Sequence, residues 1–185
     1  MPLPTYVSEH FEFDRATPNE SEWYGPINTL LGYLFPPQQY EVAPQCKGLD
    51  NPGSTDLTIL YVVSAGQGTS KHPVCFFEIK PAGHLQYRAT RAAADGQLRE
   101  RFGYLVDILV IPKLYGISTI GSRFAVYEYD RASETLTPHE IARNAQVVND
   151  TAPETRWAHD FLDGDAGEAR LLEVAQDIRT MCAAL

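Results

Sequence analysis

Glu78 and Lys80 are the first residues whose types and spacing suggest chemistry. They flank Ile79 in segment 74–80, which is rich in apolar and aromatic residues and ends at Pro81. Successive side chains of a strand point to opposite faces, so the carboxylate and the ammonium would share one face of this predicted strand. The sequence therefore predicts an acid and a base next to each other. An ordinary ion pair on a solvated strand face is the alternative interpretation.

Asp56 begins the preceding predicted strand and is the third member of this candidate site. If the two strands pair as a hairpin centred on Gly68, Asp56 lies opposite Lys80 and Thr58 lies opposite Glu78. This register would bring two carboxylates and one ammonium into a single cluster. An Asp that only caps a turn is the alternative for Asp56.

Two neighbouring carboxylates repel each other unless they share a cation, and oxygen ligands of this kind suit Mg²⁺ or Mn²⁺. Asp56 and Glu78 are therefore predicted metal ligands. Lys80 would orient an attacking water or stabilise the negative charge that develops on a phosphoryl group. The chemistry that this cluster predicts is metal-assisted hydrolysis of a phosphodiester.

The elements that must position these residues follow from hydrophobic periodicity. Apolar residues recur at helical spacing from Trp23 to Leu34, after the capping residues Asn19 and Ser21 and before Pro36-Pro37. The same reasoning predicts strands over 39–47, 56–63 and 74–80, a helix over 87–105, a hairpin of 113–119 with 123–129, and a helix over 166–184. This order predicts an α/β or α+β fold with a central mixed β-sheet flanked by helices.

This pattern of residues and elements resembles the PD-(D/E)XK, or restriction-endonuclease-like, nuclease superfamily over residues 20–130. The resemblance implies an αβββαβ core, here with a β-hairpin extension and a C-terminal helix. It also implies that Glu22 is a further metal ligand and that Gln97, on the second helix, assists catalysis. A cap or helix-dipole interaction is the alternative for Glu22. The segment Glu78-Ile-Lys-Pro, together with residues 91–101 and 114–118, looks like uncharacterised fungal proteins of this group.

Substrate contacts are predicted on the second helix. The guanidinium groups of this segment could clamp phosphates, although ion pairs with Asp95 explain two of them equally well. The candidates are Arg88, Arg91, Arg99, Arg101 and Tyr104.

The charge distribution is compatible with a local anion site in an acidic chain. The net charge is −9, whereas residues 71–123 carry eight basic and four acidic groups. Nucleic acid is therefore a possible partner of the 71–123 segment, although any acidic protein contains some basic stretch. A protein partner or a homodimer is also possible.

Length and composition predict one domain over 1–185, with an irregular arm over 1–18 and a C-terminal extension over 131–185. The resemblance implies that this domain is nuclease-like. Three separated cysteines indicate neither a disulfide framework nor a cysteine zinc site. Without a signal-like or membrane-spanning apolar run, we expect an intracellular protein, cytoplasmic or nuclear, that does not engage a membrane. The leading function is a Mg²⁺- or Mn²⁺-dependent nuclease. The alternative is a catalytically inactive nuclease-fold module that binds a protein or nucleic-acid partner.

Overall fold

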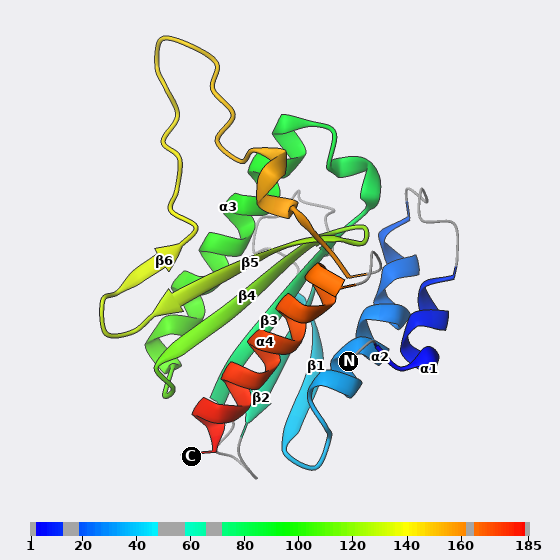
Figure 1. The fold of residues 1–185 in the computed structure, drawn as a ribbon. Coiled ribbons are helices and arrows are strands. Elements are labelled where there is room, and N and C mark those ends of the chain that lie inside the picture. The colour runs from blue at the N-terminus through cyan, green and yellow to red at the C-terminus, as the bar shows by residue number, and fades with distance from the viewer. Residues whose placement is uncertain (1–2, 13–18, 48–57, 66–71, 162–164, 184–185) are drawn as a thin grey trace.

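The computed structural model describes residues 3–12, 19–47, 58–65, 72–161 and 165–183, and shows an α+β fold (Figure 1). Within these ranges, seven strands form one mixed sheet. The strands are β1 (Tyr40–Lys47), β2 (Thr58–Ala65), β3 (His72–Lys80), β4 (Lys113–Ile120), β5 (Arg123–Asp130), β6 (Thr135–Thr137) and β7 (His159–Asp160). The α-helices are α1 (Thr5–Ser8), α2 (Tyr24–Leu34), α3 (Arg88–Leu105) and α4 (Asp165–Cys182). Short 3₁₀ turns are η1 (Glu9–Phe11), η2 (Glu20–Trp23), η3 (Ala82–His84), η4 (Val106–Ile108) and η5 (Glu154–Trp157).

The sheet runs in the order β1-β2-β3-β4-β5, and both β6 and β7 pair with β5. The first three strands form an antiparallel meander, β3 and β4 are parallel, and β4 and β5 form a hairpin. A parallel pair needs a long crossover, and α3 provides it between β3 and β4. The predicted coarse fold class and its main helices and strands are therefore confirmed.

The predicted register of β2 against β3 is wrong by two residues. Leu60, not Thr58, lies opposite Glu78. One residue of the difference arises because Ala65 pairs with His72 across the turn, and the other arises from a β-bulge at which Val74 is the extra residue. The shift is an even number of residues, so every side chain stays on the face of the sheet that was predicted for it.

Helix α3 covers one face of the sheet, and α4 covers the other (Figure 1). On the α3 face, the Phe102 ring meets the Phe76 ring edge to face, with 4.9 Å between their centroids. Gly116 lies beside Phe76 on β4, and an added Cβ there would lie 2.8 Å from each of the two rings. Gly116 therefore allows α3 to lie close to β3 and β4. This close approach places the helix above Glu78 and Lys80, which share the face of Phe76.

The N-terminal segment is more regular than the predicted irregular arm. Residues 5–11 form α1 and η1, and Val7 and Phe11 are fully buried. The Phe11 ring packs 5.0 Å from that of Phe161, and Phe161 stacks on Phe124 of β5. Burial of these apolar side chains stabilises the short helical turns, which would not persist in isolation.

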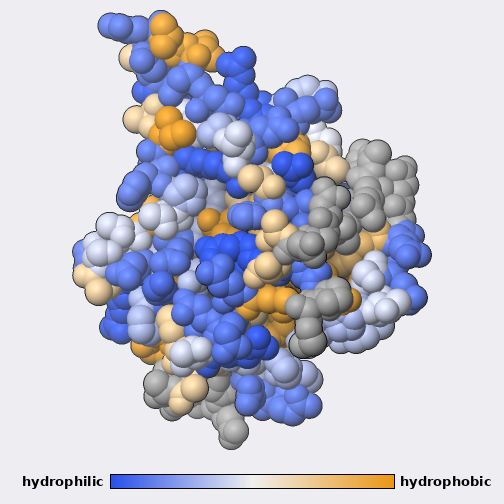
Figure 2. All heavy atoms as spheres, viewed as in Figure 1, coloured by the Kyte–Doolittle hydropathy of each residue, from blue (hydrophilic) through white to orange (hydrophobic). Residues whose placement is uncertain are grey.

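The segment between β6 and η5 projects away from the sheet (Figure 1), and Figure 2 shows hydrophobic residues on it. Val147 and Val148 in this segment are 61% and 89% exposed. Among the described residues, no helix combines the length and the apolar character that crossing a membrane requires.

Strand β1 is the first strand in the sheet order, and it contains Pro44 in its interior. Pro44 pairs with Tyr61 of β2 and is exposed to solvent. Proline has no N–H to donate, so a strand tolerates it where that side faces away from the neighbouring strand.

Candidate active site

The structure brings Glu78 and Lys80 together at the C-terminal end of β3, as predicted. The Lys80 Nζ lies 3.7 Å from Glu78 Oε1. This is not a solvated surface pair, since Glu78 is 1% and Lys80 8% exposed. The second carboxylate oxygen, Oε2, is buried and has no hydrogen-bond partner. A buried carboxylate with an unpartnered oxygen is costly, and such an atom calls for a functional explanation.

The electrostatics of Glu78 reflect this environment. Burial, the largest effect, raises the pKa of Glu78 to about 7. The positive charges of Lys80 and Arg101 lower the pKa, and the negative charge of Glu20 raises it. A carboxyl group that titrates near neutrality, held among two cations and a second acid, is typical of functional sites.

Helix α3 contributes Arg101 and Gln97 to this side of the sheet. Arg101 is 8% exposed, and its charge acts on Glu78. Gln97 precedes it by one helical turn, and residues at this spacing share a helix side. The Gln97 Oε1 is buried without a hydrogen-bond partner. The structure thus places a second unpartnered oxygen acceptor on the α3 side that Arg101 occupies.

The first acidic turn contributes Glu20, which the sequence analysis did not select. In a 3₁₀ turn residues i and i+3 align, so Glu20 shares the side of the buried Trp23. Glu20 Oε1 accepts a hydrogen bond of 2.7 Å from the Tyr24 hydroxyl. The predicted ligand Glu22 is exposed. The spacing of Glu20 to Trp23 was the available signal, but the sequence indicated an α-helical rather than a 3₁₀ start.

The predicted ligand Asp56 lies outside the described residues. Within the ranges that the structure describes, no group of three or more His, Cys, Asp or Glu side chains is arranged to hold a metal ion. Glu20 is the acid whose negative charge raises the pKa of Glu78. The two carboxylates are hard oxygen donors of the kind that Mg²⁺ and Mn²⁺ take.

Arg91 and Arg99 of α3 are engaged inside the protein. Arg91 donates to Asp150 Oδ2 at 2.6 Å, to the Ala152 carbonyl at 2.8 Å and to the Leu85 carbonyl at 2.6 Å. Asp150 and Ala152 belong to the segment between β6 and η5. Arg91 thus fastens this segment to the start of α3, and its partner is Asp150 rather than the predicted Asp95.

Arg99 forms the predicted helical ion pair with Asp95, at 2.8 Å, and also donates to the Pro138 carbonyl. Asp95 also accepts a hydrogen bond of 2.5 Å from Tyr127 and pairs with Arg156. The Asp95 carboxylate is therefore the centre of a buried network that joins α3, β5 and η5.

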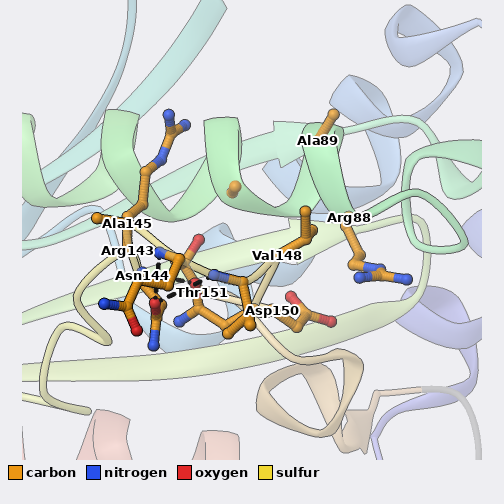
Figure 3. Close-up of a pocket in the computed structure, with 12 residues that line it drawn as sticks. Arg88, Ala89, Arg143, Asn144, Ala145, Val148, Asp150 and Thr151 are labelled. Atoms are coloured by element: carbon orange, nitrogen blue, oxygen red, sulfur yellow. Dashed lines mark hydrogen bonds between the residues drawn. The ribbon is translucent and has the colours of Figure 1, made fainter.

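The remaining two candidates are exposed. The Tyr104 hydroxyl donates to Glu100 on the same helix. Arg88 lines a hollow of about 400 Å³ between α3 and residues 143–151. Figure 3 shows the guanidinium groups of Arg88 and Arg143 far apart, at different ends of this hollow. Arg88 and Arg143 are therefore not placed to bind the same anion in this hollow.

Glu78, Lys80 and Arg101, with Gln97 on the same helix side as Arg101, are thus the predicted residues that the structure assembles. A comparison of the chain with protein-family models, curated proteins and solved structures finds no match.

Proposed function

We propose that the chain is a divalent-metal-dependent phosphodiester hydrolase with its active site at Glu78 and Lys80. The observation that carries the proposal is the buried Glu78 carboxylate, which has Lys80 at one oxygen and no partner at the other. The element order α2, β1-β2-β3, α3, β4, with β4 parallel to β3, supports the resemblance to the restriction-endonuclease-like core.

In this proposal Glu78 and Glu20 hold the Mg²⁺ or Mn²⁺ ion. Their oxygens suit a hard cation, and the ion would remove both the repulsion between the two acids and the unsatisfied Oε2. Glu20 thereby replaces Glu22 as the ligand from the first helical segment. When bound, the ion supplies positive charge beside the phosphoryl group that is attacked.

The other residues act on the water and on the phosphoryl group. The Lys80 ammonium and the unpartnered Gln97 Oε1 would orient the attacking water through hydrogen bonds. As the water oxygen bonds to phosphorus, the bond from phosphorus to the leaving oxygen breaks; the water's proton passes to solvent, and the leaving oxygen takes a proton from solvent. Arg101 binds a non-bridging phosphoryl oxygen and stabilises the negative charge that develops there. Each group is held by a regular element, β3 or α3, so its position is set before the substrate arrives.

Metal binding is tested by calorimetry with Mn²⁺ on the purified chain. We expect binding that is lost in Glu78→Gln and retained in Glu100→Gln, a control that removes an exposed acid from α3. The titration is run at pH 8.5, where the Glu78 carboxyl, whose pKa is about 7, is ionised. Wild-type protein that binds no Mn²⁺ under these conditions would disprove the proposal.

Hydrolysis is tested with plasmid, single-stranded DNA and RNA, each with and without Mg²⁺. We expect metal-dependent cleavage that is lost in Lys80→Met, a neutral side chain of similar length, although this variant still binds Mn²⁺. Cleavage that survives in Lys80→Met would show that the activity comes from another site or from a contaminant.

The second candidate is a catalytically inactive module of the same fold that binds a protein or nucleic-acid partner. The burial of Lys80 and the internal pairing of Arg91 and Arg99 favour it, because these groups have little access to a ligand. It predicts neither Mn²⁺ binding nor cleavage, so the same two experiments distinguish it from the hydrolase.

A further inference from the structure

Among the described residues, the basic segment 71–123 does not present a continuous positive surface. Seven of its eight Lys and Arg residues lie in the described ranges, and most of them act on groups of the protein itself. The internal partners are Glu78 for Lys80, Asp150 for Arg91, Asp95 for Arg99, Glu128 for Lys113 and the Trp157 carbonyl for Arg123.

These internal contacts are not easily exchanged for contacts to a phosphate. The Arg91 and Arg99 side chains are 5% and 15% exposed, and each donates to more than one acceptor. A guanidinium that turned outward would leave a carboxylate and one or more carbonyls without their donor. Arg91 and Arg99 are therefore held by internal contacts and are not available to bind a polyanion.

The side chains of the candidate active site are also buried. Glu78, Lys80 and Arg101 are 1%, 8% and 8% exposed. A nucleic-acid duplex carries phosphates along both strands, and an enzyme that grips a duplex neutralises many of them with exposed cations. A narrow strand end or a small diester needs only the few positive charges that this site provides. The net charge of −9 further opposes a long polyanion.

We propose that the substrate is a short or single-stranded phosphodiester, held through one or two phosphate groups at Arg101, while Lys80 orients the attacking water. The inference rests on the proposed hydrolase function and specifies its substrate class. Intact duplex is then a poor substrate, because its further phosphates find no matching row of cations among the described residues of 71–123.

The test compares kcat/KM for a dinucleotide, a tetranucleotide, a long single strand and the duplex of the same sequence, in deoxyribose and ribose forms, with Mn²⁺. Lys80→Met provides the background rate. We expect kcat/KM per scissile bond to level off at the shortest lengths and to fall at least about tenfold for the duplex. For one or two phosphate contacts, log kcat/KM should fall against log salt concentration with a slope of about −1.

Efficient duplex cleavage with a slope of about −5, as expected for six phosphate contacts, would overturn this inference and leave the hydrolase proposal standing. A rise of kcat/KM with strand length beyond the tetranucleotide would also overturn it. If the wild-type protein cleaves none of these substrates at any salt concentration, the hydrolase proposal fails, and this inference fails with it.

Discussion

At Glu78, burial and neighbouring charges have opposite effects on the pKa of the side-chain carboxyl. Desolvation favours its protonated form, whereas Lys80 and Arg101 favour its ionised form, and the balance leaves the pKa at about 7. The group would therefore ionise in the fold only near neutrality, well above the usual range of a glutamate.

The stability of the metal-free protein should depend on pH through Glu78. The unfolded carboxyl releases its proton near 4.5 and the folded one near 7. Between these values the folded state binds more protons, so the free energy of unfolding should fall as pH rises, by up to about 3 kcal/mol. Glu78→Gln lacks this contribution. Its stability relative to wild type should therefore rise from pH 4.5 to 7 and stay level above pH 7.

Denaturant unfolding with EDTA at a series of pH values measures this difference. The wild-type-minus-variant comparison removes the pH dependence that other carboxyl groups contribute. Glu100→Gln serves as the matched control, and its difference from wild type should not vary in the same way. A difference for Glu78→Gln that is constant from pH 4.5 to 8 would contradict the described environment of this carboxyl.

Glu20 and Glu22 form a matched pair of acids on one turn. If Glu20 holds the ion, Glu20→Gln should weaken Mn²⁺ affinity at least about tenfold. Glu22→Gln removes the same charge from an exposed side chain and should change the affinity less than about twofold. Calorimetry measures both variants, and equal losses would show that only overall charge matters.

At the scale of the elements, the contact of α3 with the sheet depends on the absence of a side chain at Gly116. Gly116→Ala should destabilise the protein by about 1–3 kcal/mol, because the new Cβ would overlap the Phe76 and Phe102 rings. Gly103→Ala on α3 is the opposite case. Its Cβ would meet no atom within 4 Å, and alanine should stabilise the helix by about 0.5–1 kcal/mol.

Chemical denaturation of the two alanine variants tests this prediction, and the signs should differ. Because α3 carries Arg101, Gly116→Ala should also displace this arginine from Glu78. If Gly116→Ala were as stable as wild type, α3 would not lie against β4 as described.

The main elements could be predicted because their hydrophobic periodicities are long, as in α3 and α4. The pairing of Glu78 with Lys80 follows from strand alternation alone. The register against β2 could not be predicted, because a single bulged residue, Val74, shifts it. The short strands β6 and β7 and the turns α1 and η1 were missed, because tertiary contacts rather than local periodicity stabilise them.

Contacts within one element of the candidate site could be predicted from the sequence, whereas contacts between two elements could not. Arg91 lies four residues before Asp95, so local spacing suggested that pair, but the fold gives Arg91 a partner 59 residues away, Asp150. Likewise, the choice of Glu20 over Glu22 depends on a 3₁₀ geometry that sequence periodicity does not reveal.

At the scale of the whole molecule, the two ends of the strand order differ. Both β6 and β7 lie along β5, at its opposite ends. At the other side β1 carries a proline where a hydrogen-bond donor would otherwise stand. An open strand edge is a template for pairing with another chain, and proline is one residue that blocks such pairing.

Pro44→Thr should therefore increase self-association at high protein concentration, because threonine restores the N–H and favours strand structure. Light scattering during prolonged incubation measures the change. Pro153→Thr, at the N-terminal cap of η5, is the matched control and should leave the scattering unchanged. Scattering that is equal in all three proteins would show that Pro44 has no such role.

The missing donor of Pro44 thus has a meaning beyond the geometry of one strand. A strand that lacks one of its donors is a poorer starting point for fibrillar growth by edge pairing. At Pro44 a neighbouring chain therefore finds no donor to pair with, which opposes extension of the sheet from this strand.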